Sequence, residues 1–319
     1  MPRRAGERGA VEAGALPGLL PGGRPATDPR AREETAAAWG VDSLPRSPGR
    51  DTGQIVEAAA TGELGALLVG GVEVADLPDP ARARQALDAV GFLVSLEQRP
   101  GEVSDRADVV LPVAAVAEKA GTFLNWEGRA RPFETAIKPD QLTRRHALPD
   151  ARVLHMLAEA MDVPLALPDL SAVRAEMAAL GRWGGERAAD PAEPGRALPR
   201  PRGGEAMLAG HRLLLDRGRL QEGDDALAGT RHAAFARLSA ATAAEAGVAD
   251  GEVLAVSGPA GTVRLPVRIT PMPDRVVWLP LNSVGGGVAS DTGAVPGELV
   301  RIAAESGEDR ATEGREMRS

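Results

Sequence analysis

The chain has 319 residues, 43% of them hydrophobic, which is enough for the cores of about two domains. Its net charge of −8 argues against unaided nucleic-acid binding, and the lack of a long apolar run or a signal-peptide core predicts a cytoplasmic location. Cysteine is absent, and iron–sulfur clusters and thiolate metal sites need cysteine ligands, so we expect neither on this chain.

Residues 1–150 are expected to alternate helix and strand. The predicted elements are a helix over Gly53–Ala60 capped by Asp51 or Thr52, a strand over Ala66–Val69, a helix that begins at Pro80, and strands over Phe92–Leu96 and Val109–Leu111. This order predicts an α/β domain with a Rossmann-like parallel sheet. The sequence contains neither GxGxxG nor GxxxxGK[ST], so an ordinary NAD or ATP phosphate loop is not expected.

The segment ADVVLPVAAVAEKAGTFLNWEGRAR, from Ala107 to Arg131, is the most informative. Its apolar run Val109–Leu111 predicts a strand covered on both faces and ended by Pro112. We expect about two helical turns over Pro112–Ala120, with Gly121 as a left-handed cap. Ligands bind beyond the carboxyl ends of such strands, where a polar group follows here around Trp126: Thr122, Asn125, Glu127 and Arg129.

Two interpretations of these polar residues stay open. They can hydrogen-bond a ligand, with Arg129 suited to a bidentate phosphate contact. Alternatively, Thr122 and Asn125 satisfy backbone groups while Glu127 pairs with Arg129 or Arg131. Glu118 and Lys119, just before them, are expected to be a solvated pair rather than an acid–base couple. The four histidines lack metal-ligand spacing and no serine has a GxSxG context, so we predict no catalytic residue and no metal site.

The rest of the chain is predicted to contain four further parts. These are a helical segment over 151–181, a flexible linker rich in Gly, Pro and Arg over 182–206, a β domain over 207–304 and a disordered, charged tail over 305–319. In the β domain, Ser239 is expected to cap a short helix that Gly247 ends. A period-two strand with Val263, Leu265, Val267 and Ile269 on one face follows, and Pro266 requires an edge or a bulge in it.

Several segments resemble the molybdopterin-guanine-dinucleotide oxidoreductases. This family includes formate dehydrogenases, nitrate reductases and the large iron–sulfur subunit of bacterial NADH-quinone oxidoreductase. ADVVLP followed by EKAGTFLNWEGR resembles a signature of the family, and RGAVEAGALPGLLPGG resembles the segment before its third domain. Met207–Ile302 resembles its dinucleotide-binding double-psi β-barrel. Leu213–Thr230 and Met272–Ser283 are most similar to the NADH-quinone oxidoreductase subunit of actinobacterial type.

The resemblance implies a cofactor, molybdopterin guanine dinucleotide, held by Thr122, Asn125, Glu127 and Arg129 together with Asn282 and Ser283. For Asn282 and Ser283, which follow a predicted barrel strand, a plain turn is an equal alternative. One departure counts against this role. Cofactor-holding relatives have Gly-X-Asn-Pro where this chain has Gly71-Val72-Glu73-Val74, which lacks the amide and places a carboxylate where phosphates would be repelled. We therefore expect no cofactor on this chain, with the family's iron–sulfur clusters only on a missing N-terminal part. The chain is expected to be a C-terminal fragment or the product of a split gene, although a complete small protein stays open.

The hypothesis that follows is a structural part of the large subunit of NADH-quinone oxidoreductase. This part would lie at the cytoplasmic face of the membrane, next to other peripheral-arm subunits, and would not oxidise NADH alone. The alternative is a catalytic molybdopterin oxidoreductase, similar to formate dehydrogenase or nitrate reductase, that binds a bis-pterin cofactor through Thr122, Asn125, Arg129 and Asn282. A third possibility is a free-standing binding module that uses only the barrel.

Overall fold

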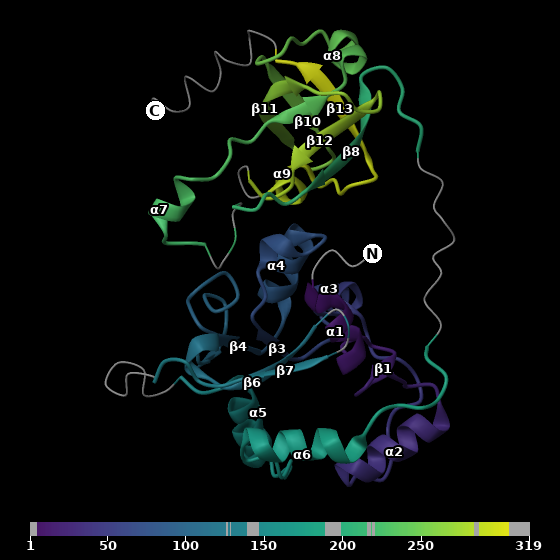
Figure 1. Cartoon of the computed structure of the whole chain (residues 1–319), viewed down its shortest axis with the longest axis vertical. Coiled ribbons are helices and arrows are strands. Elements are labelled where there is room, and N and C mark those ends of the chain that lie inside the picture. Colours follow the sequence, from purple (N-terminus) through teal and green to yellow (C-terminus); the bar gives the residue numbers. More distant parts are fainter. Residues whose placement is uncertain are drawn as a thin grey trace. The chain divides into compact units, whose positions relative to one another are not determined.

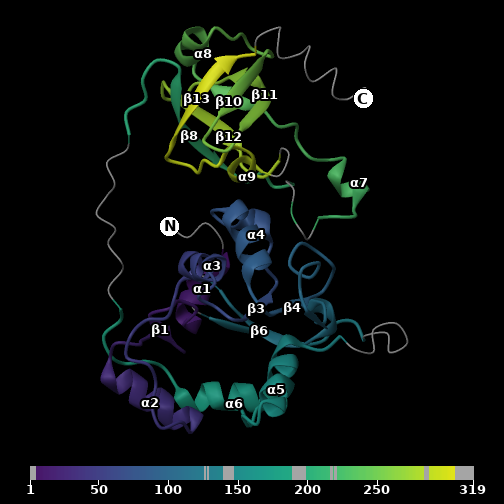
Figure 2. The same ribbon diagram turned by 180° about the vertical axis from the view of Figure 1, so that it is seen from behind.

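The computed structural model describes residues 5–125, 127, 129–138, 147–188, 199–215, 218, 221–283 and 287–305. The chain divides into two units. The N-terminal unit contains residues 1–72 and 85–192, and the C-terminal unit contains residues 73–84 and 193–319. Figures 1 and 2 show both units from opposite sides. Within the described residues, no helix combines the length and the apolar character that a membrane span needs.

A sheet of three parallel strands belongs to the N-terminal unit. Its order is β3 (Leu67–Gly70), β4 (Leu93–Glu97) and β5 (Val109–Pro112), and the predicted parallel pairing is confirmed. The connection from β3 to β4 contains α4 (Pro80–Ala89), which begins at the predicted proline. α3 (Thr52–Ala60) precedes β3 and has the predicted cap, because the carboxylate of Asp51 accepts from the N–H of Gln54 at 2.8 Å.

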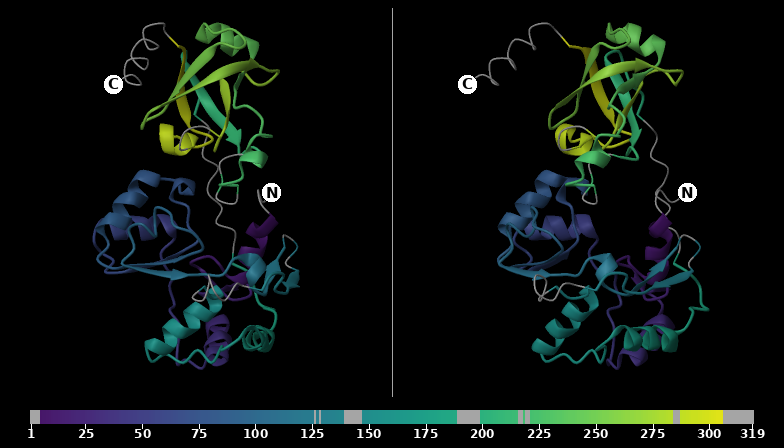
Figure 3. Two further views of the ribbon diagram at one scale, coloured as in Figure 1. Left: turned by 90° about the vertical axis from the view of Figure 1, so that its left-hand side faces the viewer. Right: turned by 60° about the vertical axis from the view of Figure 1, so that its left-hand side comes forward.

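The prediction that β5 is covered on both faces is wrong for this chain. Val109 is 38% exposed and Val110 is 44% exposed. β5 is the last strand of its sheet, so Val110 has a neighbouring strand on one side only. Leu111 packs against a small cluster that includes Val153 of α5 (Asp150–Ala160), but this cluster does not contain Val109. In both panels of Figure 3, α5 (teal) lies below the strands of the N-terminal unit.

The helix predicted over Pro112–Ala120 is also wrong. Past β5 the chain stays extended, because Val113 forms a parallel bridge with Leu148 and the N–H of Ala114 donates to the Leu148 carbonyl at 2.8 Å. Only a single 3₁₀ turn follows, η2 (Val116–Glu118). A backbone partner more than thirty residues away therefore overrides the local preference for a helix.

Gly121 is not a helix cap but the first residue of a β-hairpin. The hairpin pairs β6 (Gly121–Leu124) with β7 (Ala130–Phe133) in antiparallel register. The φ angle of Gly121 is not positive, so its lack of a side chain matters for space instead. A Cβ atom at Gly121 would lie 2.5 Å from the ring of Phe133, which faces it across the hairpin.

Arg24 connects three elements of the N-terminal unit. It belongs to β2 (Arg24–Pro25), which pairs with β1 (Leu19–Leu20), and its side chain is buried. The guanidinium donates to the carbonyls of Leu180 at 2.7 Å and Gly181 at 3.3 Å, which end α6 (Leu170–Leu180). Its Nε atom lies 3.5 Å from the carboxylate of Glu34 on α2 (Pro29–Trp39). α1 (Ala5–Ala13) contacts the β6–β7 hairpin instead.

A closed barrel of six strands forms most of the C-terminal unit. The order around the barrel is β10-β11-β9-β12-β8-β13, and β13 pairs again with β10. Its strands are β8 (Glu205–His211), β9 (Ala236–Leu238), β10 (Val253–Ser257), β11 (Thr262–Ile269), β12 (Val276–Pro280) and β13 (Leu299–Ala304). The helices are α7 (Asp225–Ala228), α8 (Ala240–Ala246) and α9 (Val288–Thr292). Closure gives every strand a neighbouring strand on both sides.

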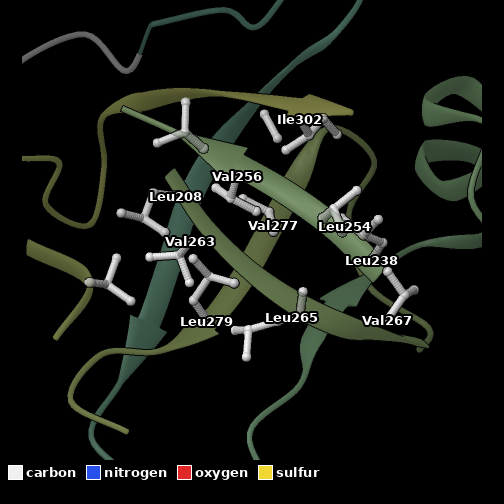
Figure 4. Close-up of a cluster of buried hydrophobic side chains, with 14 of the residues drawn as sticks. Leu208, Leu238, Leu254, Val256, Val263, Leu265, Val267, Val277, Leu279 and Ile302 are labelled. Carbon is white, nitrogen blue, oxygen red and sulfur yellow. The ribbon is translucent and has the colours of Figure 1, made fainter. Parts of the chain in front are cut away.

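Aliphatic side chains from all six strands form the hydrophobic core of the barrel, and Figure 4 shows part of it. The predicted alternation along β11 is confirmed for Val263, Leu265 and Val267, which are buried, whereas Ile269 at the end of the strand is exposed. Pro266 is tolerated because pairing with β9 begins only at Val267, so the strand is locally an edge at the proline. The cap of α8 by Ser239 and its end at Gly247 are also confirmed.

The expected boundaries around the barrel need two corrections. The stretch predicted as a linker, 182–206, includes the first two residues of β8, because strand pairing with β13 already begins at Glu205. Glu305, expected to open the disordered tail, donates its N–H to the Val253 carbonyl and lies 3.4 Å from the Arg264 side chain. Of the remaining residues in these two predictions, 189–198 and 306–319 lie outside the described residues.

Arg24→Met should destabilise the N-terminal unit by about 3 kcal/mol or more, because the charge-assisted bonds to the carbonyls at the end of α6 are lost. The matched control is Arg30→Met, which removes an exposed ion pair to the same Glu34 and should cost less than about 0.5 kcal/mol. Urea denaturation followed by circular dichroism compares the two. Equal effects of both substitutions would contradict the role assigned to Arg24.

Candidate functional site

The β6–β7 hairpin contains four of the six residues predicted from the sequence to bind a cofactor. Thr122 is exposed on β6, and Asn125, Glu127 and Arg129 lie in the turn that joins the strands. Trp126, around which they were expected to gather, lies outside the described residues. The hairpin is anchored by Arg174 of α6, which donates to the Gly121 carbonyl at 3.0 Å. Phe123 and Phe133 stack on one face of it, with ring centroids 4.7 Å apart.

The polar groups of the turn bind one another. The side-chain oxygen of Asn125 accepts from the N–H of Glu127 at 3.0 Å and from the N–H of Arg129 at 2.9 Å. The guanidinium of Arg129 lies 3.1 Å from the carboxylate of Glu127, and both side chains reach solvent. This is the geometry of a self-contained turn. A role of these residues in cofactor binding stays a prediction.

Lys119 is not part of a solvated pair, as the sequence suggested. Its side chain is largely buried and forms an ion pair with Asp150 in the first turn of α5. The neighbouring Glu118 accepts instead from the backbone N–H of Ala115 at 3.4 Å. The prediction of a solvated pair failed because the partner of Lys119 is 31 positions away in the sequence. Neither residue is arranged as an acid–base couple.

Asp108 has a structural role that the sequence reasoning missed. Its carboxylate accepts from the N–H of Leu93 at 2.7 Å, and its own N–H donates to the Leu93 carbonyl at 2.9 Å. These two bonds fix the start of β5 against the start of β4. An acidic residue immediately before an apolar strand was the available signal, because Asp side chains commonly bind nearby backbone N–H groups.

The other two predicted residues, Asn282 and Ser283, follow β12 at one end of the barrel. Asn282 is buried, and its side-chain oxygen would be 3.0 Å from a Cβ atom placed on Gly287. The φ angle of Gly287 is 108°, a conformation that favours glycine. The hydroxyl of Ser283 is buried and has no hydrogen-bond partner within the described part of the chain. An orphaned buried hydroxyl is unusual and can serve a ligand.

Trp278 of β12 contacts Arg237 of β9 and His211 of β8 on the outer face of the barrel. The Trp278 ring lies 5.0 Å from the guanidinium of Arg237 and 5.4 Å from the His211 ring, edge to face. His211 ends β8 in register with Pro280, the last residue of β12. β8 and β12 approach closely, since a Cβ atom on Gly210 would lie 2.1 Å from the Leu279 carbonyl oxygen. Such an arrangement can stack on a planar group, but it offers no pair for acid–base chemistry.

A surface groove of 1230 Å³ lies in the N-terminal unit, away from the residues predicted from the sequence. The charged side chains that line it already form hydrogen bonds or ion pairs within the unit. Arg187 forms two hydrogen bonds to Glu12, at 2.6 and 3.1 Å, and this contact raises the pKa of Arg187 above its usual value. Arg50 pairs with Glu63 at 2.8 Å, and Asp51 caps α3. Among the described residues, no group of three His, Asp or Glu side chains is arranged to hold a metal ion.

Two family models match the chain. Residues 5–147 match the model described as molybdopterin oxidoreductase, and residues 218–308 match the model described as molydopterin dinucleotide binding domain. The chain belongs to the molybdopterin oxidoreductase family. The first match contains the β3–β5 sheet and the hairpin, and the second contains most of the barrel. The two matches leave the helical segment with α5 and α6 outside.

Two curated relatives with high sequence identity are G subunits of NADH-quinone oxidoreductase. The chain is 75% identical to the G subunit of NADH-quinone oxidoreductase from Streptomyces coelicolor over 95% of its own length and 36% of the relative. It is 53% identical to the corresponding G subunit of Mycobacterium bovis over 96% of its length and 38% of that relative. The chain therefore spans little more than a third of the length of either relative.

The chain is similar in fold to a solved structure of low sequence identity. Acetylene hydratase from Pelobacter acetylenicus superposes with a TM-score of 0.54 and 15% sequence identity. The superposition covers 86% of this chain and 49% of the hydratase. At this identity the likeness concerns the fold alone.

Asn125→Ala should destabilise the hairpin by about 1–2 kcal/mol, since two backbone N–H groups lose the acceptor that closes the turn. Asn125→Asp is the matched control, because a carboxylate keeps the acceptor oxygen, and its loss should be smaller. Thr122→Ala on the exposed strand face should have almost no effect. Urea midpoints and the rate of proteolysis near residue 127 measure the differences. An Asn125→Ala protein as stable as the parent would mean that the amide is available for another partner.

Proposed function

We propose that the chain forms part of the G subunit of an NADH-quinone oxidoreductase and has a structural role there. The observation that carries this proposal is 75% identity to the Streptomyces coelicolor protein over 95% of the chain. In the whole complex, electrons would pass from NADH to quinone through carriers bound elsewhere. This chain has no cysteine with which to ligate an iron–sulfur cluster.

The arrangement of the polar residues supports a structural role. In the hairpin turn, the Asn125 oxygen is occupied by two backbone N–H groups, and Glu127 and Arg129 pair with each other. In this conformation the polar groups of the turn bind one another, so the turn does not need a ligand to satisfy them. The loop after β3 contains Val72 and Glu73. Glu73 stands where cofactor-holding relatives have an amide side chain, and its carboxylate would repel phosphates.

The proposed surroundings follow from the same relationship. The partners would be other subunits of the peripheral arm, and the location would be the cytoplasmic face of the membrane. Both units would then act as folded supports for the polypeptide that holds the electron carriers, and this chain alone would not oxidise NADH.

A chimera tests the proposal. This chain would replace its matched segment in the Streptomyces coelicolor G subunit, and NADH-driven quinone reduction would be measured in membranes. At 75% identity we expect activity within about threefold of the parent enzyme, because most interface contacts are retained. A strain with the matched segment deleted is the control. A chimeric protein that is present in normal amount but never enters the membrane complex would refute the proposal.

The second candidate is a catalytic molybdopterin oxidoreductase. It is favoured by the match of the barrel to a molydopterin dinucleotide binding domain and by the orphaned hydroxyl of Ser283. Bound there, the cofactor would supply oxidation–reduction chemistry at a metal centre, and Ser283 would bind its nucleotide part. Elemental analysis of protein purified from cells grown with molybdate and tungstate separates the candidates. We expect no stoichiometric molybdenum or tungsten, and one metal atom per chain would support this second function over the structural one.

A further inference from the structure

A row of apolar side chains crosses the parallel sheet and reaches solvent. Leu68 of β3, Val94 of β4 and Val109 of β5 are directly in register across the three strands. Leu68 is 47% exposed and Val109 is 38% exposed, whereas Val94 between them is half-buried. Phe92, the residue directly before β4, is 46% exposed. These four residues are named here the open sheet face.

Helix α5 covers only the other half of this side of the sheet. Val153 of α5 packs with Leu96 and Val113, and Leu111 and the half-buried Val94 lie against this cluster. Leu96 and Leu111 are two positions further along their strands than Val94 and Val109, so the cover ends before the row reaches Leu68 and Val109. The opposite side of β4 is fully buried at Leu93 and Ser95.

Parallel strands are normally covered on both faces, because their connections place other elements there. The sequence of β5 agrees with this rule, since its continuous apolar run is typical of a strand buried on both sides. The exposure of Val109 and Val110 therefore contradicts the composition of the strand. Within the described residues, the outer edge of β3 has no strand partner, and the outer edge of β5 meets Leu148 at its end alone. Exposed apolar faces beside open edges are interaction sites or aggregation hazards.

A long polypeptide is available to cover this face. Almost two thirds of the length of the Streptomyces coelicolor relative lies outside the segment that matches this chain. We propose that the open sheet face docks an apolar element of that remaining polypeptide of the same G subunit. This inference rests on the proposed function. The occupant is then a segment whose apolar side chains meet Leu68, Phe92 and Val109, since no charged residue belongs to the face.

Hydrogen exchange tests the docking without a substitution. Peptides over residues 107–113 would be followed in the isolated chain and in the assembled chimera. We expect exchange to be at least about tenfold slower in the chimera, because docking protects the backbone of β5. Equal exchange in both samples would overturn the inference. Full protection in the isolated chain would also overturn it, since the C-terminal unit or a second copy would then be the occupant.

Two substitutions test the side chains themselves. In the isolated chain, Leu68→Glu with Val109→Glu should change Tm by only about 3 °C or less, because both positions are exposed. In the chimera the same pair should reduce the assembled enzyme at least about tenfold, because two carboxylates would be buried without partners. Leu214→Glu is the control, since Leu214 is 92% exposed, and it should reduce neither quantity.

The outcomes separate this inference from the function on which it rests. An unsubstituted chimera that does not assemble overturns both. A chimera that assembles equally well with and without the two glutamates overturns the docking alone. Sedimentation of the isolated chain adds a further outcome, because a dimer that Leu68→Glu with Val109→Glu dissociates would assign the face to a second copy and overturn the proposed occupant.

Discussion

The requirement that a parallel sheet be covered on both faces governs the N-terminal unit. The central strand β4 meets it on the side of Leu93 and Ser95, where both side chains are buried. On the other side, α5 meets it only over the ends of the strands, around Leu96. Two further contacts hold this sheet together: Asp108 fixes β5 to β4, and Lys119 ties the segment after β5 to the start of α5. The stability of the sheet therefore depends on elements that arrive from distant parts of the chain.

The barrel of the C-terminal unit covers its own apolar side chains, because the closed sheet encloses them. Every strand has two neighbours, and the aliphatic core fills the interior without an aromatic side chain. This matters in a chain with only 3% aromatic residues, because small aliphatic side chains can still reach close packing inside a narrow closed barrel. The core of a closed barrel is enclosed by its own strands. The two units therefore differ in the cover of their apolar side chains. The sheet of the N-terminal unit exposes some of them, whereas the barrel encloses its core.

The sequence predicted those features whose cause is local. The capping box at Asp51, the helix start at Pro80, the cap at Ser239 and the alternation from Val263 to Val267 depend on residues within a few positions. The predicted parallel pairing was confirmed, but several other predictions failed where a distant partner decides the outcome. The segment after Pro112 is extended because Leu148 pairs with it, and Lys119 is buried because Asp150 faces it. The prediction that β5 is covered on both faces was wrong for the same reason. The burial of a strand depends on which elements pack against it and not on its own residues alone.

The turn from Asn125 to Arg129 explains why the candidate site could not be assigned from its composition. The same polar residues that suit a phosphate also suit a tight turn, and here they make the hydrogen bonds of the turn. A ligand that used the Asn125 oxygen would have to break these bonds, at a cost of about 1 kcal/mol for each backbone N–H left unpaired. Ser283 differs, because its hydroxyl is buried without a partner among the described residues, and a ligand would gain a bond there without breaking one. The energetic argument for binding is therefore stronger at the barrel than at the hairpin, although the hairpin carries the more recognisable sequence.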